Sequence, residues 1–249
     1  MLYYNLHILN YIAIIIFLRF SDIKIDISLD IISLMKPIIT KENNFSYLFI
    51  ALITIMFSSA VVAQVSNHIA DNIFLALIVS MLIVSIKSLR LKMPIKILIG
   101  IYTLGAILHT TTTYKFAPYM ILATLLIFFI TAYISAYKQI LFEGIIDRNK
   151  LIGSVTLYLL LGNIWTMVYL IIILIDPNAF SGLEVTNWQQ GFARVGYYSF
   201  VTLTTLGYGD ILPHNHIAEF FVSLEAIAGI FYVAIVVSSL ISLKLNNTK

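Results

Sequence analysis

The sequence predicts an all-α membrane protein that crosses the bilayer several times, and three observations support this fold class. First, 60% of the 249 residues are hydrophobic and only 11% are charged, far below the roughly one-quarter charged residues of a soluble domain. Second, six stretches are apolar over close to the roughly 20 residues that a spanning helix needs. Third, the basic residues lie mostly on one side of these stretches. A water-soluble core could not bury this much apolar surface, so the bilayer is the expected solvent.

The six predicted spans follow one another and occupy residues 45–64, 73–89, 97–114, 117–137, 151–175 and 217–243. A tight turn at 115–118 joins the third and fourth spans as a helical hairpin. A seventh apolar stretch, 3–20, is shorter and less uniform: it spans the membrane, lies in the interface or acts as a signal segment. We expect a membrane-associated helix there, within a cytoplasmic or interfacial segment 1–44.

The distribution of basic residues predicts the orientation of the spans. When the loop between the fifth and sixth spans faces outward, the outer loops contain only Lys115 and Arg194. The inner segments then contain Lys36, Lys41, Arg90, Lys92, Lys96, Lys138, Arg148, Lys150, Lys244 and Lys249. This asymmetry follows the positive-inside rule. Both ends of the six-span block are therefore expected in the cytoplasm.

The remaining chemistry argues against an enzyme. The sequence contains no cysteine, which excludes disulfides, thiolate metal sites and cysteine nucleophiles. It also contains no Walker sequence, zinc-ligand spacing or nucleophile elbow, and the spans contain no cluster of His, Asp or Glu. We therefore expect no catalytic residues, no cofactor and no nucleic-acid partner.

The most specific motif lies between the fifth and sixth spans, where residues 197–210 read YYSFVTLTTLGYGD. This segment resembles the pore signature of potassium channels, Thr-x-x-Thr-x-Gly-Tyr-Gly-Asp, and the resemblance extends over about residues 151–243. It implies a re-entrant selectivity filter in which K⁺ binds backbone carbonyls. The ion-binding filter residues are then Thr205, Leu206, Gly207, Tyr208 and Gly209. The carbonyls of the first four and the Thr205 hydroxyl form the K⁺ sites, and K⁺ is the permeant ion, not a cofactor.

The physics of such a filter requires these residue types. A dehydrated K⁺ needs oxygens that replace its water shell, and an extended loop supplies them only if its backbone conformation alternates. Gly207 and Gly209 adopt positive φ at little cost. Irregular backbone is tolerated at membrane depth only where it is buried in protein or lines the ion path. Leu206 stands where Val is commoner, and we expect its side chain to point away from the pore. A Gly-rich reverse turn would explain the glycines but not the threonines.

The residues before and after the filter are expected to support it. A pore helix is predicted at about 190–203, with its C-terminal dipole favouring a cation. The resemblance gives supporting roles to Tyr197, Tyr198, Thr202, Thr204 and Asp210. We expect Asp210 to accept a hydrogen bond from Tyr198.

Two residues of the sixth span are candidates for gating. Gly229 lies where related channels often have a hinge glycine, although close helix packing explains a glycine equally well. Glu225 is an ionisable group inside a span, and such a group needs a partner or water. The fourth span contains no Arg or Lys before Lys138, so voltage gating is expected to be weak or absent.

The predicted protein has four N-terminal transmembrane helices (45–137) and a two-helix pore domain with a pore helix (151–249). One filter per chain does not enclose a pore, so the expected partners are three further copies in a homotetramer, the lipid bilayer and K⁺. A poorly selective monovalent cation channel and a potassium transporter subunit remain alternatives. We expect a multi-pass protein of the plasma membrane, and the Ile-, Lys- and Asn-rich composition favours a bacterial inner membrane.

Overall fold

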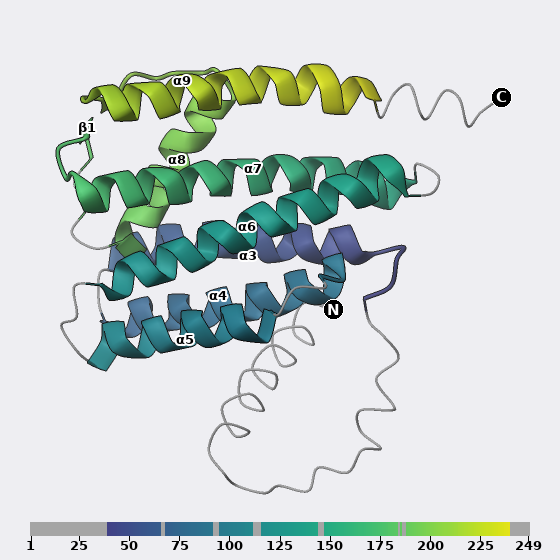
Figure 1. The fold of residues 1–249 in the computed structure, drawn as a ribbon, viewed down its shortest axis with the longest axis horizontal. Coiled ribbons are helices and arrows are strands. Elements are labelled where there is room, and N and C mark those ends of the chain that lie inside the picture. Colours follow the sequence, from purple (N-terminus) through teal and green to yellow (C-terminus); the bar gives the residue numbers. More distant parts are fainter. Residues whose placement is uncertain are drawn as a thin grey trace, which may run out of the picture.

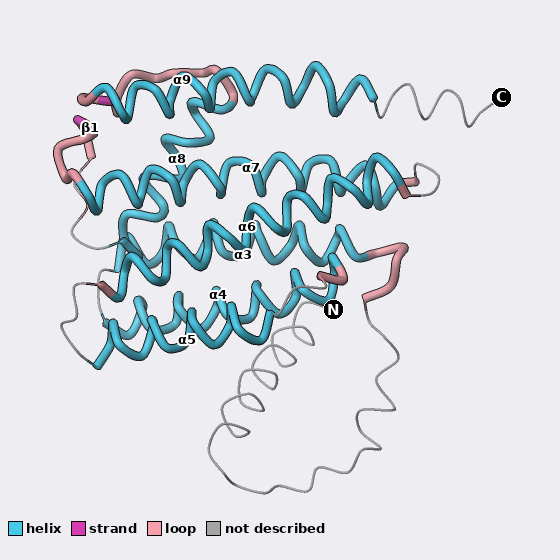
Figure 2. Tube along the Cα trace, in the orientation of Figure 1, coloured by secondary structure: helices cyan, strands magenta, loops and turns pink. Residues whose placement is uncertain are grey.

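The computed structural model describes residues 39–65, 68–91, 95–111, 116–143, 147–183, 185 and 188–239. The predicted segment 3–20 and most of the predicted domain 1–44 lie outside the described residues. Within the described part the chain is almost entirely helical (Figures 1 and 2). The α-helices are α3 Asn44–Val65, α4 His68–Leu89, α5 Ile95–Thr111, α6 Ala117–Phe142, α7 Arg148–Ile175, α8 Trp188–Leu203 and α9 His216–Phe231.

Three further elements belong to the described chain. A π-helix, η1 Tyr232–Val237, continues α9 without a break. Two short strands, β1 Phe180–Ser181 and β2 Leu212–Pro213, form an antiparallel pair in which Phe180 faces Pro213. The strand pair thus connects the chain after α7 to the chain before α9.

The helices of membrane length confirm the all-α membrane fold class. Five of them are long and apolar enough to cross a bilayer: α3, α4, α6, α7, and α9 together with most of η1. The third predicted span, 97–114, corresponds to α5, which has 17 residues and an apolar part at Ile97–Ala106. At 1.5 Å per residue α5 is about 26 Å long, shorter than the roughly 30 Å hydrocarbon core.

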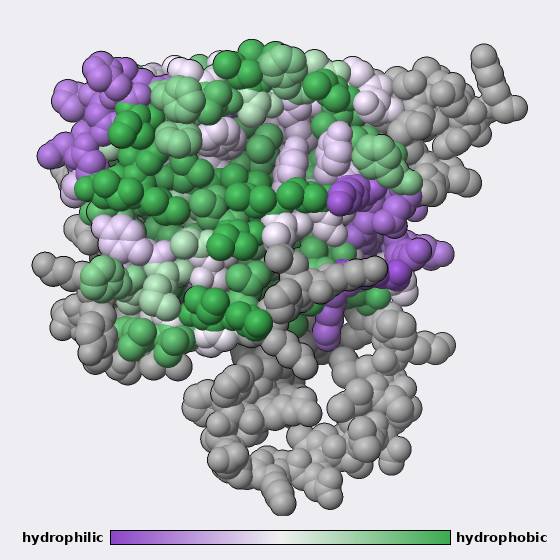
Figure 3. Space-filling model, viewed as in Figure 1, coloured by the Kyte–Doolittle hydropathy of each residue, from purple (hydrophilic) through white to green (hydrophobic). Residues whose placement is uncertain are grey.

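Successive long helices run in opposite directions, so their ends gather at two ends of the molecule (Figure 1). The end at which α3 and α7 begin also holds the C-terminal ends of α4 and α6. Lys41, Arg90, Lys138, Arg148 and Lys150 belong to this end, which we call the basic end. Polar residues gather at the two ends in Figure 3, with a hydrophobic band between them, as expected for a bilayer-spanning surface.

Local signals explain several helix boundaries. The side chain of Asp147 accepts a hydrogen bond from the backbone N–H of Lys150 at 2.9 Å and so caps α7. Pro118 lies in the first turn of α6, where its missing N–H costs nothing. Asn215 caps α9 in the same way, through the backbone N–H of Ala218.

Helices α3, α4 and α6 pack on the region that contains the filter motif, and α5 packs on α4 and α6. Helix α3 contacts α4, α7 and α8, and α6 packs along α7. The ring of Phe74 on α4 lies 5.6 Å from that of Phe192 on α8 and 6.3 Å from that of Trp188. The N-terminal half of α8 is therefore held by aromatic contacts from α4.

Close helix crossings fix α8 against α7. A Cβ atom added to Gly162 of α7 would lie 2.5 Å from the Phe200 ring of α8. The absence of a side chain therefore lets this ring fill the crossing. The hydroxyl of Tyr158 on α7 donates to the carbonyl of Leu203, 3.1 Å away, at the last residue of α8. These contacts determine where the segment after α8 begins.

Candidate functional site

The segment 204–211 follows α8 and has an unusual backbone. Thr205, Gly207 and Gly209 have positive φ of 59°, 57° and 78°, whereas Leu206 and Tyr208 between them do not. A Cβ atom at Gly207 or Gly209 would meet nothing within 4 Å, so conformation and not space requires glycine there. An alternation of this kind turns every second peptide, so that successive carbonyls can point to the same side.

The start of this segment folds back on the end of α8. The backbone N–H groups of Leu206 and Gly207 both donate to the carbonyl of Val201, at 3.0 and 3.3 Å. The Thr204 hydroxyl donates to the carbonyl of Phe200 at 2.7 Å. The segment is therefore held through its N–H groups. Its carbonyl oxygens at 205–208, the predicted K⁺ ligands, accept no backbone hydrogen bond among the described residues.

The predicted filter side chains are exposed in the single subunit. Tyr208 is 66% exposed and Leu206 is 56% exposed, and the whole stretch 204–210 lies at the surface. The Tyr208 ring stacks on that of Tyr197, with centroids 6.3 Å apart and planes inclined by 10°. Such an exposed run of irregular backbone is costly in a membrane unless another surface covers it.

The contacts of Asp210 differ from the prediction. Its carboxylate forms an ion pair with Arg194 at 4.0 Å, and it lies within electrostatic reach of the Tyr197 hydroxyl. Tyr198 is instead buried, with its ring 5.5 Å from that of Tyr169 and 5.4 Å from that of Phe180. The expected hydrogen bond from Tyr198 to Asp210 is therefore wrong within one subunit, because adjacent helical residues point in different directions.

Tyr198 and Thr202 lie on the supporting side of α8, not on the exposed segment. Tyr198 interacts with Thr202 one turn further along the helix. Val201 is 9% exposed, and its carbonyl accepts the hydrogen bonds from Leu206 and Gly207. The predicted supporting residues thus fall into an exposed group around Asp210 and a pair on α8, of which Tyr198 is buried and Thr202 half-buried.

The far end of the segment is held by the chain before α8. Gly182 has φ of 78°, and a Cβ atom there would lie 2.1 Å from the carbonyl oxygen of Asp210. The backbone N–H of His214 donates to the carbonyl of Ala179 at 2.8 Å. Residues 179–182 therefore form a support on which the end of the filter segment rests.

Glu225 joins three helices in the interior of the subunit. Its side chain is fully buried. The Tyr169 hydroxyl of α7 donates to Oε2 at 2.5 Å, and Oγ of Ser199 on α8 lies 2.6 Å from Oε1. The same Ser199 oxygen lies 2.9 Å from the carbonyl of Gly162. Within the part of the chain that the structure describes, no ion pair reaches Glu225, so hydroxyl groups supply its polar contacts.

Gly229 lies one turn beyond Glu225 on α9. A Cβ atom there would lie 2.0 Å from the carbonyl oxygen of Leu203. Close contact with the end of α8 therefore accounts for the glycine, and a hinge at this position stays a prediction. Together with Glu225, this contact places α9 directly against the base of the filter segment.

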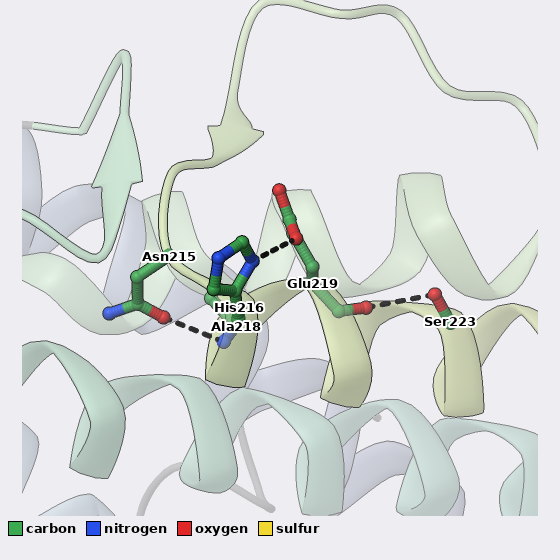
Figure 4. A network of polar contacts seen from close by, with 5 residues as sticks. All are labelled: Asn215, His216, Ala218, Glu219 and Ser223. Carbon is green, nitrogen blue, oxygen red and sulfur yellow. Dashed lines mark hydrogen bonds and ion pairs between the residues drawn. The ribbon is translucent and has the colours of Figure 1, made fainter.

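The start of α9 carries the exposed histidine, His216, shown in Figure 4. Its Nδ1 lies 3.1 Å from Oε2 of Glu219, and both side chains are exposed. The amide of Asn215 donates to Asp176 at 2.7 Å, which ties the start of α9 to the end of α7. No group of three or more metal-ligating side chains occurs among the described residues.

Four residues that contact the candidate site residues were not predicted from the sequence. Arg194 and Gly182 contact Asp210, and Tyr169 and Ser199 contact Glu225. A usable signal existed for Ser199, since it lies within the filter motif between Tyr198 and Thr202. Tyr169 and Gly182 lie 41 and 28 residues before Asp210, and only the packing of α7 and of residues 179–182 brings them near.

Comparison with known proteins agrees with this geometry. Residues 154–244 match the family described as ion channel. These residues cover most of α7, all of α8, the filter segment and α9, so the part of the chain around the filter motif is similar to an ion-channel family.

One curated relative is the potassium channel subfamily K member 16 of Mus musculus. It is 34% identical over 80 residues, a match that covers 29% of this chain and 26% of that protein. The chain thus matches about a quarter of the length of this relative. No solved structure matches the chain.

Proposed function

We propose that the protein is the subunit of a homotetrameric potassium channel, with the filter at residues 205–209. The observation that carries the proposal is the alternation of φ from Thr205 to Gly209 within the motif TLGYGD. It is the backbone condition for a row of carbonyl oxygens along one side of the segment. Four such rows around an axis replace the hydration shell of K⁺.

The proposed tetramer rests on what one subunit leaves uncovered. The stretch 204–210 is exposed. In the most apolar part of α9 with η1 only 22% of the window is buried within the subunit, against 50% for α7. A fourfold axis beside the filter segment would cover both surfaces at once. Aromatic and ionic contacts of Tyr197, Tyr208 and Asp210 would then lie between the filter and its support.

We propose weak or no voltage dependence. Helix α6 contains one basic residue, Lys138, which is exposed and lies near its C-terminal end at the basic end. One charge crossing 100 mV supplies about 2.3 kcal/mol, and steep gating needs several per subunit. The stimulus that opens the pore would therefore be another one.

The test of the proposed function is ion flux through purified protein in liposomes. K⁺ should pass and Na⁺ should not, and the reversal potential in a K⁺/Na⁺ gradient should follow the K⁺ equilibrium potential. Gly207→Ala, which places a side chain at φ of 57°, should abolish this selectivity. Liposomes that remain impermeable to K⁺ would overturn the proposal.

The same recordings distinguish the proposed channel from two alternatives. A poorly selective cation channel would give a reversal potential near zero in the gradient. A transporter subunit would turn over far more slowly than a pore and would give no unitary currents. The exposed filter segment favours the channel, because its predicted carbonyl ligands are free of other hydrogen bonds among the described residues.

A further inference from the structure

The basic end of the molecule contains an open cleft of about 770 Å³, away from the filter segment. Its walls come from the beginnings of α3 and α7, the end of α4 and the last turns of α6. The family match begins at residue 154, and the cleft residues all precede it. The cleft is therefore not part of the ion path, and what it binds is a separate question.

The floor of the cleft is a network of buried amides. Asn44 and Asn149 are each only 6% exposed. The Asn44 amide donates to the carbonyl of Ser88 at 2.9 Å and to Oε1 of Gln139 at 3.1 Å. The Asn149 amide donates to Oδ1 of Asn44 at 2.7 Å and to the carbonyl of Lys41 at 2.9 Å. These bonds hold four helices in one arrangement, so the floor is preformed.

One acceptor in this floor has no donor. Oδ1 of Asn149 is buried and has no hydrogen-bond partner among the described residues. A buried acceptor left unpaired costs about 1–3 kcal/mol in a folded protein. The arrangement therefore calls for a hydroxyl or amine that enters the cleft and donates to Asn149.

Three cations surround the opening of the cleft. Lys41 precedes α3, Arg90 follows α4 and Lys138 lies on α6; all three are exposed. None of the three forms an ion pair within the described residues. Carboxylates also line the cleft, from Glu42, Glu143 and Asp147. With Lys150 the cleft carries four cations and three carboxylates, so it suits a group that combines an anion with hydrogen-bond donors.

The side of the cleft that faces the membrane is apolar. Ile134 lines the cleft and is 48% exposed. Ile130 and Ile127, four and seven residues earlier on α6, are 40% and 48% exposed. Residues at this spacing lie on one helix face. An exposed isoleucine stripe therefore leads from the cleft along α6 toward the middle of the hydrophobic band.

We propose that this cleft binds the headgroup of an anionic glycerophospholipid that carries free hydroxyls, such as phosphatidylglycerol. The phosphate lies among Lys41, Arg90 and Lys138. A headgroup hydroxyl donates to Oδ1 of Asn149, and the acyl chains follow the isoleucine stripe of α6. Basic pockets between membrane helices bind anionic headgroups in this way. The stripe favours a lipid over a soluble phosphate, which would leave it unused.

The test compares lipids on the purified full-length chain by native mass spectrometry from a neutral detergent. Phosphatidylglycerol should remain bound at concentrations at which phosphatidylcholine does not. The triple variant Lys41→Gln, Arg90→Gln and Lys138→Gln should lose at least about tenfold in phosphatidylglycerol affinity, since each basic residue near a membrane surface contributes roughly fivefold. The matched control Lys87→Gln with Arg148→Gln removes exposed cations near the same end, outside the cleft lining, and should keep the affinity.

Three outcomes would overturn the proposal. Equal retention of phosphatidylglycerol and phosphatidylcholine would show that no anionic headgroup is recognised. Equal losses in the triple variant and the control would show general charge attraction. Glycerophosphoglycerol, the headgroup without acyl chains, should not displace the lipid at equal concentration, and efficient displacement would show a site for a soluble anion. Phosphatidic acid should bind more weakly than phosphatidylglycerol because it lacks the headgroup glycerol whose alcohol hydroxyl donates to Asn149; equal binding would contradict that contact. All these measurements are independent of ion conduction.

Discussion

Two helices flank the filter segment, and they are buried to very different degrees. Over their most apolar windows, α7 is 50% buried within the subunit, whereas α9 with η1 is 22% buried. The buried residues of α7 lie all along its length, from Asn149 to Ile173. Those of α9 are Ala218, Glu225 and Gly229. Helix α7 is therefore well covered by its own subunit, whereas most of the α9 surface is uncovered. Helix α9 is attached to the subunit through a few buried residues, among them Glu225 and Gly229.

The largest expected effect comes from filling the place where Gly229 of α9 approaches the backbone of α8. Gly229→Ala puts a Cβ atom 2.0 Å from the Leu203 carbonyl, so α9 must move away from the base of the filter. Overpacking of this kind typically costs about 1–3 kcal/mol. We expect loss of K⁺ flux and a lower thermal midpoint in detergent.

Its matched control is Gly100→Ala on α5, where a Cβ atom would meet nothing within 4 Å. Alanine is the better helix former by about 1 kcal/mol, so this variant should be as stable as the parent or more so. Similar losses in the two variants would mean that the α8–α9 contact has no special role.

The next effect concerns the buried carboxyl group of α9. Glu225→Leu leaves the hydroxyls of Tyr169 and Ser199 without this partner in an apolar interior. Each unsatisfied group costs about 1–3 kcal/mol. Glu225→Gln keeps one acceptor and should be milder in both thermal stability and open probability.

The exposed Glu219→Gln serves as a control on the same helix, because its carboxylate contacts only an exposed histidine side chain and the backbone around it remains. If Glu225→Leu were as stable and as active as Glu219→Gln, the contacts of Glu225 with α7 and α8 would not be required.

The third prediction tests whether the exposed surface of α9 is covered by another subunit. Because the sequence contains no cysteine, any disulfide must come from an introduced cysteine. Single cysteines are introduced at exposed positions of α9 and η1: Ile227, Ile230, Phe231 and Val233. At least one should form an intersubunit disulfide on oxidation, since subunits around an axis bring equivalent helices close. The comparison position is Val155 on α7, which is 52% exposed.

Non-reducing gels give the readout for this scan. Cysteine at position 155 should stay monomeric, because we expect that face of α7 to meet lipid. A cross-link there, with none along α9, would reverse the comparison between the two helices and contradict the proposed axis beside α9.

The smallest effect is expected at the exposed ion pair. Arg194 and Asp210 lie 4.0 Å apart with side chains 54% and 40% exposed, and pairs of this kind contribute about 0–1 kcal/mol. Arg194→Gln should change the thermal midpoint of the isolated subunit by little. If Arg194→Gln strongly destabilised the detergent-solubilised tetramer but not the isolated subunit, assembly would bury the pair.

The sequence predicted most of the helices, and the exceptions have physical causes. Spans such as 45–64 and 117–137 differ from α3 and α6 by a few residues at their ends, because apolar composition specifies a span but not its last turn. The 3–20 segment is outside the described residues. Five of the cations assigned to the inner side lie together at the basic end, and the side of the membrane that this end faces stays a prediction.

The candidate site was predicted as a motif but not as a set of contacts. The positive φ values of Gly207 and Gly209 follow directly from residue type, whereas the positive φ of Thr205 does not. Which of Tyr197 and Tyr198 lies near Asp210 depends on the rotation of α8 about its axis. Two identical adjacent residues do not reveal that rotation in the sequence. Glu225 was expected to need a partner or water, and its partners come from α7 and α8 of the same chain.

The π-helical turn at the end of α9 has one more consequence. In residues 232–237 the hydrogen bonds close wider rings than in an α-helix, so each later side chain is displaced by about one position around the axis. A helical wheel drawn through Ala218 and Glu225 therefore assigns the wrong angular position to Ser238 and Ser239, the last described residues. Mutagenesis of this helix, in the channel proposed above, should therefore count its faces afresh from Ser238.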